Sequence, residues 1–272
     1  MAMKNTAVRP LVICLHASAS SARQWQPLAD RAGDQFDIVA PDLHGHGAGP
    51  AWLGDPRDIV EADVKRVARL TSVDRRAHLV GHSYGGAVAL RMALEIPERV
   101  MSVTVYEPVL FAALRDHAPR SREALEVQAI ARAVARDVRA GLSTHAARRF
   151  VDYWSGNGSF ASMPAQRRDA VALRMGAVAA HFQSLWNDPM RLTDVGACAV
   201  PLTVLYGSQT RAPARRIVEL LRLVRRDAQA SMLTAMGHMG PLTHPATLAQ
   251  RVHADLVAHE RGSWQSPRKL AA

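Results

Sequence analysis

Short apolar runs alternate with longer amphipathic segments along most of this chain. The apolar runs predict β-strands at residues 11–15, 36–40, 77–80, 100–106, 202–206 and 230–233. The amphipathic segments between them predict helices at residues 21–32, 58–70, 84–95, 212–224 and 245–259. Such alternation is typical of parallel strands joined by crossover helices, in a sheet that is buried on both faces. We therefore expect an α/β fold with a mostly parallel, doubly wound sheet.

Residues 111–195 interrupt this alternation. They show helical patterns at 123–138, 145–154 and 166–180, with no convincing strand between them. We expect a helical cap over the C-terminal edge of the sheet, where open α/β sheets place their ligand sites. The expected organisation is a core of residues 1–110 and 196–262, a cap insertion of residues 111–195, and a poorly ordered tail at 263–272.

The formal net charge of +10 changes this picture little. A basic chain can attract nucleic acid or an anionic membrane. Its arginines, however, come in scattered pairs within helical patterns, which indicates solvated helix faces. Aromatic residues make up 5% of the chain and offer few platforms for base stacking. We expect no nucleic-acid partner.

The cysteines and the apolar run near the N-terminus indicate the cellular compartment of the protein. Cys14 and Cys198 form no framework of spaced pairs, so reduced thiols are expected. The apolar run at 11–15 is shorter than the roughly 7 to 15 residues of the hydrophobic region of a signal peptide, and His16 interrupts it. No run reaches the roughly 18 apolar residues of a membrane span. These features predict a cytoplasmic protein without stable membrane insertion.

The candidate chemistry begins at Gly81-His82-Ser83-Tyr84-Gly85, a G-x-S-x-G pattern between a predicted strand and a predicted helix. A sharp strand-to-helix turn that exposes a serine hydroxyl needs small residues on both sides of the serine. The N-terminus of the following helix would point at the serine oxygen. A glycine-rich turn without chemistry is the alternative, but the flanking strand and helix favour Ser83 as a nucleophile.

With four further stretches, this motif makes the chain resemble the α/β-hydrolase superfamily along nearly its whole length. The stretches are the oxyanion-type loop at 15–20, the glycine turn at 40–47 with His44 where arginine is usual, the strand end at 206–210, and the histidine loop with the last helix at 237–245. The resemblance implies an α/β-hydrolase fold with a helical cap and esterase-like or lipase-like chemistry at a serine.

A serine of this kind needs a base, and histidine suits that task because its ordinary pKa lies near neutral pH. His238 is the best candidate because it follows a predicted strand and Gly237 in a loop that can turn back over the sheet edge. His82 adjoins Ser83, but neighbours on a tight turn point apart, so we expect it to be packed. His244 is expected at the start of the last helix.

The position of the acid departs from the commonest pattern. Three residues after Gly207 stands Thr210, which carries no negative charge. Some members of the superfamily take the acid from the end of the strand after the serine helix, which here is Glu107. An unpaired carboxylate would be costly to bury there, and Glu107 keeps the chain order serine, acid, histidine. The alternatives are that Glu107 caps the insertion or pairs with an arginine, with Asp188 as the second candidate acid.

The resemblance also implies an oxyanion hole made by the backbone N–H groups of Tyr84 and Ser18. Ala17 stands where glycine is usual, which restricts this loop. A metal site at His44 and His46 is possible, but they lie in a glycine turn without an evident third ligand. We expect no metal and no other cofactor.

The substrate is expected to be a small-molecule acyl compound. Residues that could contact it are Ala17, Phe111, Trp154, Trp186 and Met239, although helical spacing favours core packing for most apolar cap residues. We expect hydrolysis of a small or medium hydrophobic ester, thioester or lactone through an acyl-enzyme. Alternatives are acyl transfer, carbon–carbon bond hydrolysis, cofactor-free perhydrolase chemistry, or a non-catalytic binding protein, the last suggested by Thr210.

Overall fold

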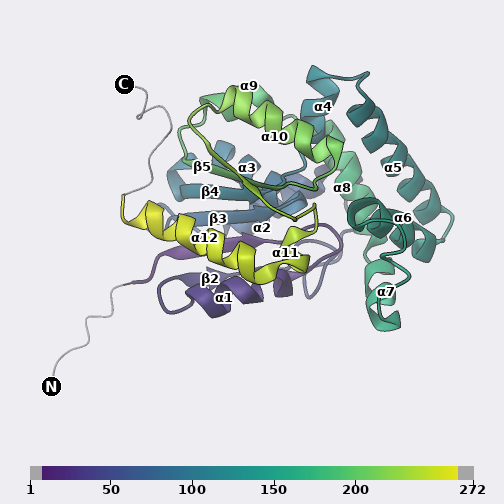
Figure 1. Ribbon diagram of the computed structural model, residues 1–272, viewed down its shortest axis with the longest axis horizontal. Helices are drawn as coiled ribbons and strands as arrows, with labels where there is room; N and C mark the ends of the chain where they lie inside the picture. Colours follow the sequence, from purple (N-terminus) through teal and green to yellow (C-terminus); the bar gives the residue numbers. More distant parts are fainter. Residues whose placement is uncertain (1–7, 263–272) are drawn as a thin grey trace.

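A computed structural model describes residues 8–262 of the chain, so the tail expected at 263–272 lies outside the described residues (Figure 1). Its sheet has six parallel strands in the order β2-β1-β3-β4-β5-β6. They are β1 (Leu11–Leu15), β2 (Asp37–Val39), β3 (Ala77–His82), β4 (Val100–Tyr106), β5 (Leu202–Gly207) and β6 (Gln229–Leu233). The predicted α/β fold is confirmed. The chain reverses its direction of travel between β1 and β3, where a ligand site is expected at the carboxyl ends of the strands.

Both faces of the sheet are buried, because successive side chains of a strand point to opposite faces. Ile13 of β1 joins the larger core with α2 (Ile59–Ala68), α3 (Tyr84–Glu95) and α10 (Ala212–Val224). Its neighbours Val12 and Cys14 join a second core with α1 (Gln26–Ala32) and α12 (Pro245–Glu260). The continuous apolar runs of the sequence therefore give strands that are covered by helices on both sides.

Most helices of this core follow the predicted bounds, but the first does not. The predicted helix at 21–32 is a 3-10 turn, η1 (Ala22–Trp25), followed by α1. Pro27 lies in the first turn of α1, where its missing N–H costs nothing, and it cannot continue a helix from earlier residues. Three more short helices are η2 (Pro56–Asp58), η3 (Pro97–Arg99) and α11 (Gly240–Thr243).

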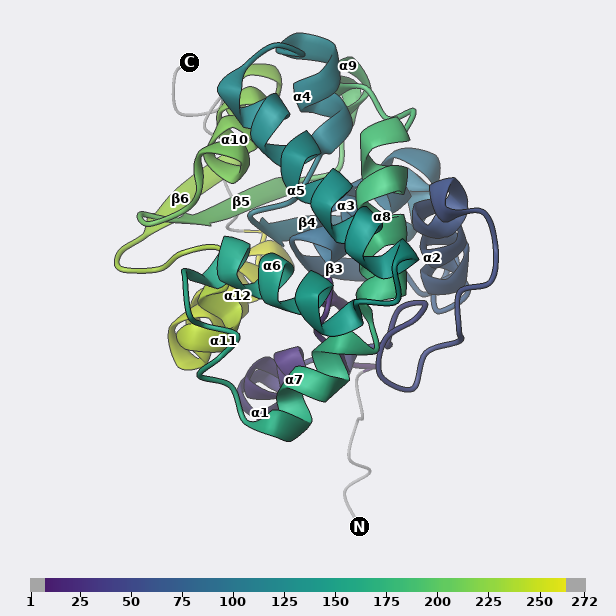
Figure 2. The same cartoon turned by 90° about the vertical axis from the view of Figure 1, so that its right-hand side faces the viewer.

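The insertion between β4 and β5 contains six helices and no strand among its described residues. They are α4 (Phe111–His117), α5 (Arg122–Arg139), α6 (Ser143–Ser155), α7 (Ala165–Ala172), α8 (Met175–Asn187) and α9 (Leu192–Ala197). Helices α5 to α8 gather at one end of the sheet in Figure 1, and Figure 2, seen from that end, shows them in front of β3 and β4. The short helix α9 instead packs on α10 and α3.

One helix predicted at 166–180 is two helices in the structure, α7 and α8. The chain leaves α7 at Leu173, which is exposed, and enters α8 at Met175, which is buried. Helix α7 buries one residue, whereas α8 buries most of its length. The break therefore marks the passage from the surface of the insertion into its interior.

A buried polar chain links the amino ends of β3 and β4 to the last helix. His78 Nδ1 lies 2.7 Å from Ser102 Oγ, and His78 Nε2 lies 2.9 Å from Glu260 Oε1 at the end of α12. His78 and Ser102 are buried within the strands. These bonds fasten the C-terminal end of α12 to the sheet. No helix within residues 8–262 is long and apolar enough to cross a bilayer.

Candidate active site

Ser83 lies at the carboxyl end of β3, directly before α3, in a strained turn. Its φ of 53° and ψ of −114° are unusual for a residue with a side chain. A Cβ at Gly81 would lie 2.5 Å from the Gly85 carbonyl oxygen, and one at Gly85 would lie 2.3 Å from the Leu15 carbonyl oxygen. Both glycines are therefore required by close packing. The turn holds the hydroxyl of Ser83 above the end of the sheet.

The structure brings Ser83, His238 and Glu107 together from three different strand ends. His238 Nε2 lies 2.9 Å from Ser83 Oγ, and His238 Nδ1 lies 2.8 Å from Glu107 Oε2. An ionised carboxylate only accepts hydrogen bonds, so Nδ1 carries a proton and donates it toward Glu107. Nε2 is then free to accept the hydroxyl proton of Ser83. All three side chains are buried.

Glu107 is fully buried and is oriented by two further hydrogen bonds. The Gly207 N–H donates to Oε1 at 2.8 Å, and the Thr210 hydroxyl donates to Oε2 at 2.5 Å. Thr210, at the position where the acid is commonest in the superfamily, thus contacts the carboxylate at the end of the neighbouring strand. The backbone of Glu107 has a φ of 43°, a second strained position at a strand end.

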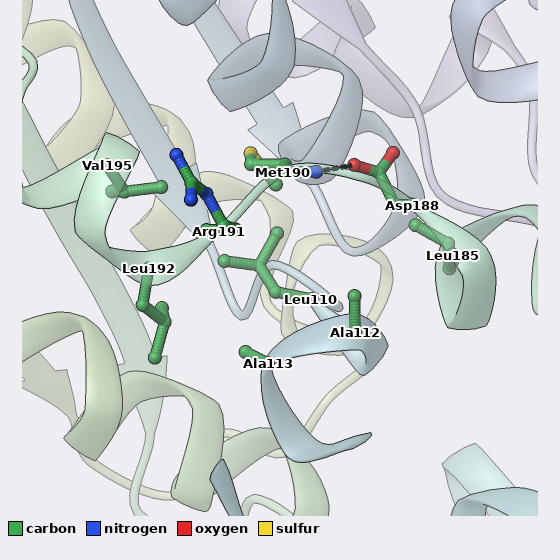
Figure 3. Close-up of a pocket in the computed structure, with 9 residues that line it drawn as sticks. All are labelled: Leu110, Ala112, Ala113, Leu185, Asp188, Met190, Arg191, Leu192 and Val195. Carbon is green, nitrogen blue, oxygen red and sulfur yellow. Dashed lines mark hydrogen bonds between the residues drawn. The ribbon is translucent and has the colours of Figure 1, made fainter. Parts of the chain in front are cut away.

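Asp188, the second candidate acid, lies elsewhere. Its Oδ1 accepts from Arg91 Nη1 at 3.0 Å and from the Met190 N–H at 2.8 Å. Figure 3 shows it in a separate pocket with Leu110 and Leu192. These contacts give Asp188 a role in holding the segment after α8.

Two buried side chains hold the loop that carries His238. His82 Nε2 donates to the His238 carbonyl oxygen at 2.8 Å, and the Tyr106 hydroxyl donates to the Gly237 carbonyl oxygen at 2.6 Å. Burial is the main reason that the pKa of His82 lies well below its ordinary value. His82 is therefore a packed, neutral residue, as its place beside Ser83 suggested.

The expected oxyanion residues are Tyr84, which follows Ser83 directly, and Ser18, which lines the same cavity as Ser83. Tyr84 is the first residue of α3, so its N–H has no partner within the helix. Ser18 follows β1 and lines the same small cavity as Ser83. The Ala17 N–H is used elsewhere, since it donates to Gln24 Oε1 at 3.3 Å. Ala17 has an ordinary φ, and the left-handed residue of this loop is Ala19, with a φ of 60°.

Buried histidines support this loop in a fixed tautomer. The Leu43 N–H donates to His16 Nε2 at 3.1 Å, and the Ala19 N–H donates to His46 Nε2 at 2.9 Å. The other ring nitrogen of each donates to a backbone carbonyl oxygen. Burial is the main cause that lowers the pKa of His16 and lowers that of His46 to about 3. Both rings are neutral, and both nitrogens of His46 are already used.

The lowered pKa values of these histidines predict that the free energy of unfolding decreases in acid. A histidine whose pKa is lower in the folded than in the unfolded protein stabilises the fold above pH 6.5, and this contribution is lost as pH falls below 6.5. For His46 the loss should extend toward pH 3, by roughly 1 kcal/mol per pH unit. Urea unfolding between pH 7 and pH 4 measures it.

His46→Gln should be less stable than the wild type at pH 7 and show a shallower decline in acid. The exposed His145→Gln, on α6, controls for the loss of one histidine. Equal slopes in the wild type and His46→Gln would contradict this account of His46.

The cavity beside Ser83 is narrow and mostly apolar. Its lining residues are Ser18, Ser83, Val109, Phe111, Phe150, Trp154, His181, Phe182 and Leu185. The space that remains holds roughly one water molecule. The indole of Trp154 stacks on the His238 imidazole, with ring centroids 3.9 Å apart. Helix α6 therefore covers the histidine directly, and an acyl chain can enter only if side chains of the insertion move.

Two of the five residues expected to contact the substrate line the Ser83 cavity. Phe111 and Trp154 line the cavity at Ser83, whereas Trp186 lines a groove between α5 and α8. Ala17 and Met239 are not among the residues that line the Ser83 cavity. Sequence reasoning missed His181, because a single histidine among the apolar residues of α8 resembles ordinary core packing.

Comparisons with known proteins show the family of the chain. Residues 12–251 match the model of the alpha/beta hydrolase family. Over 101 residues the chain is 36% identical to the dihydrolipoyllysine-residue acetyltransferase component of the acetoin cleaving system of Cupriavidus necator, a match that covers 37% of this chain and 27% of that protein. It is 34% identical over 101 residues to lipase LipV of Mycobacterium tuberculosis, covering 36% of this chain and 37% of LipV. These matches thus span about a quarter to a third of the relatives' length.

A likeness in structure extends over nearly the whole chain. The crystal structure of the enol-lactonase from Burkholderia xenovorans LB400 superimposes with a TM-score of 0.73 and 17% sequence identity, covering 93% of this chain and 94% of that one. At this identity the likeness concerns the fold alone.

Proposed function

This chain belongs to the alpha/beta hydrolase family, and we propose that it is a serine hydrolase of carboxylic esters, thioesters or lactones with a small or medium-sized hydrophobic acyl group. The observation that carries the proposal is the unbroken hydrogen-bonded chain from Glu107 through His238 to Ser83. The strained turn at Ser83 and the position of Tyr84 at the start of α3, where its N–H has no partner within the helix, support this proposal.

In the proposed reaction, His238 Nε2 accepts the proton of Ser83 as Oγ attacks the acyl carbonyl carbon. The carbonyl oxygen becomes negative and is held by the N–H groups of Tyr84 and Ser18. His238 then donates the proton to the leaving group, and the acyl group remains on Ser83. A water molecule deprotonated by His238 releases the acid. Glu107 stays ionised and stabilises the imidazolium in both steps.

The hydrophobic acyl group is proposed from the walls of the cavity. The lining includes the aromatic rings of Phe111, Phe150 and Phe182. Phe111 stacks on Phe182 with centroids 5.7 Å apart, and Phe150 meets Phe182 edge to face at 6.2 Å. Burying an acyl chain against these rings would be favourable by about 0.8 kcal/mol per methylene. A lipase among the relatives is consistent with such a substrate.

Covalent labelling tests the proposal. A fluorophosphonate should add its mass to the wild type at Ser83 and leave Ser83→Ala unmodified, and the wild type should hydrolyse 4-nitrophenyl esters from acetate to octanoate. Labelling of both proteins, or of neither, would rule out Ser83 as the nucleophile. Adding an alcohol tests for acyl transfer, and adding hydrogen peroxide tests for perhydrolase chemistry. A substrate that is cleaved at a carbon–carbon bond tests for the third alternative reaction.

Thr210→Val should lower kcat/KM for these esters by about tenfold, because Glu107 loses a hydrogen bond to a charged oxygen and with it part of its orientation. Valine keeps the shape of threonine. Thr210→Ser keeps the hydroxyl and should retain nearly full activity, with steady-state kinetics as the measurement. If the two variants have equal activity, the contact between Thr210 and Glu107 does not assist the histidine.

A further inference from the structure

A second buried histidine faces the Ser83 cavity from the helical insertion. His181 lies on α8 and is 1% exposed. Its ring is stacked on that of Tyr84, with centroids 3.5 Å apart and planes at 8°, and is parallel to that of His46 at 5.1 Å and 10°. These rings cover faces of the imidazole, and His181 is among the residues that line the cavity.

The two nitrogens of the His181 ring have different surroundings. His181 Nδ1 lies 2.8 Å from Ser18 Oγ, which lines the same cavity. His181 Nε2 is buried and has no hydrogen-bond partner within the described part of the chain. A buried polar atom without a partner is costly, and such atoms are rare unless a ligand or water satisfies them. The unpaired nitrogen therefore points to a ligand group that binds to it.

The charge state of the ring narrows the chemistry of that group. Burial first, and then the neighbouring His46, His16 and His44, hold the pKa of His181 well below its ordinary value. A neutral imidazole has one donor and one acceptor nitrogen, and the Ser18 hydroxyl can either donate to Nδ1 or accept from it. Nε2 can thus donate to an ether or carbonyl oxygen, or accept from a hydroxyl. A carboxylate could accept from the same N–H, but the described lining of the cavity contains no lysine or arginine to pair with its charge, so burying it there would be costly.

We propose that His181 and Ser18 form a hydrogen-bonding subsite for a second, uncharged oxygen in the acyl group of the substrate, close to the reacting carbonyl. The subsite deepens the proposed serine hydrolase function and rests on it. The acyl side is favoured because His181 lies in the same cavity wall as Phe182 and Leu185 of α8. A purely hydrocarbon chain would leave Nε2 unpaired, whereas an oxygenated chain of the same shape would satisfy it.

Matched fluorophosphonates test this proposal without requiring turnover. Three O-methyl phosphonofluoridates carry a pentyl, a propoxymethyl or a 2-ethoxyethyl chain, so that one methylene is replaced by oxygen at either of two positions. The measurement is the second-order rate constant for labelling Ser83. Intrinsic differences in reactivity cancel when the ratio of ether to pentyl rates is compared between wild type and variants.

The wild type should show a ratio about three- to tenfold higher than His181→Phe for at least one ether position, because phenylalanine keeps the stacked ring and removes both nitrogens. His181→Gln, whose amide reaches the position of Nε2, should restore part of the preference. Gln183→Leu on the exposed side of α8 is the matched control and should keep the wild-type ratio.

Each outcome separates the two proposals. Labelling of Ser83 with the same ratio in wild type, His181→Phe and His181→Gln would overturn the subsite and leave the hydrolase proposal intact. Absence of labelling at Ser83 would overturn both. If His181→Phe does not fold, His181→Gln decides. A ratio of ether to pentyl rates that differs from the wild type would support the subsite, and an unchanged ratio would overturn it.

Discussion

Replacing Ser83 by alanine is expected to lower kcat for ester hydrolysis by about 10⁶-fold, because the hydroxyl of Ser83 is the one that contacts His238 Nε2. The His238 nitrogen that faces Ser83 Oγ at 2.9 Å would face a methyl group. The remaining oxyanion donors could at most assist direct attack by water. Single-turnover measurements with a 4-nitrophenyl ester would show loss of the initial burst as well as of steady turnover.

The chain offers a matched control for that variant. Ser102 also contacts a histidine, at 2.7 Å from His78 Nδ1, but lies within β4. Ser102→Ala should keep kcat within about twofold and lower the free energy of unfolding by about 1 kcal/mol, the value of one hydrogen bond. Retention of more than about 1% of activity by Ser83→Ala would contradict its assignment as nucleophile.

Glu107→Gln is expected to lower kcat by about 10⁴-fold while the protein remains folded. Glutamine can keep the acceptor for the Gly207 N–H, but its amide group then faces His238. The amide would donate to Nδ1 and move the histidine proton to Nε2, the nitrogen that must accept from Ser83. The effect is on the tautomer of His238, so circular dichroism should be unchanged when kcat is lost.

Two further variants distinguish Glu107 from a structural carboxylate. Asp188→Asn should keep kcat within about threefold, because Asp188 contacts Arg91 and the Met190 backbone, whereas His238 contacts Glu107. Thr210→Asp in the Glu107→Gln background places a carboxylate beside the same atoms and should recover at least about tenfold. Near-normal activity of Glu107→Gln alone would show that another group orients His238.

The strands and the Ser83 turn could be predicted because their signals are local. A buried parallel strand is a short apolar run, and the turn depends on glycines within two residues of Ser83. His238 could be predicted for a similar reason, because it follows a predicted strand and Gly237. In each case the information lies within about ten residues of the position.

The acid could not be decided in this way. Glu107 and Asp188 each follow a regular element, and only the pairing of β4 with β5 brings Glu107 within reach of Thr210 and His238. Trp154 and Trp186 pose the same difficulty, because both are tryptophans in helices of the insertion. The packing of α6 and α8 places Trp154 at the Ser83 cavity and Trp186 at a separate groove. The role of His181 depends on its contact with Ser18, 163 residues away.

The polar chain at the amino ends of β3 and β4 has a wider consequence. His78 joins Ser102 to Glu260 at distances of 2.7 and 2.9 Å, so the same three residue types meet in contact at both ends of one strand pair. A search for triads by distance alone would retrieve both. At the amino end the serine sits inside a strand, with 0% of its surface exposed, and no acyl carbon can approach its oxygen. Contact with a histidine and a carboxylate is therefore not sufficient to identify a nucleophile. Ser83 differs from Ser102 in the positive φ of its turn and in its place beside a cavity.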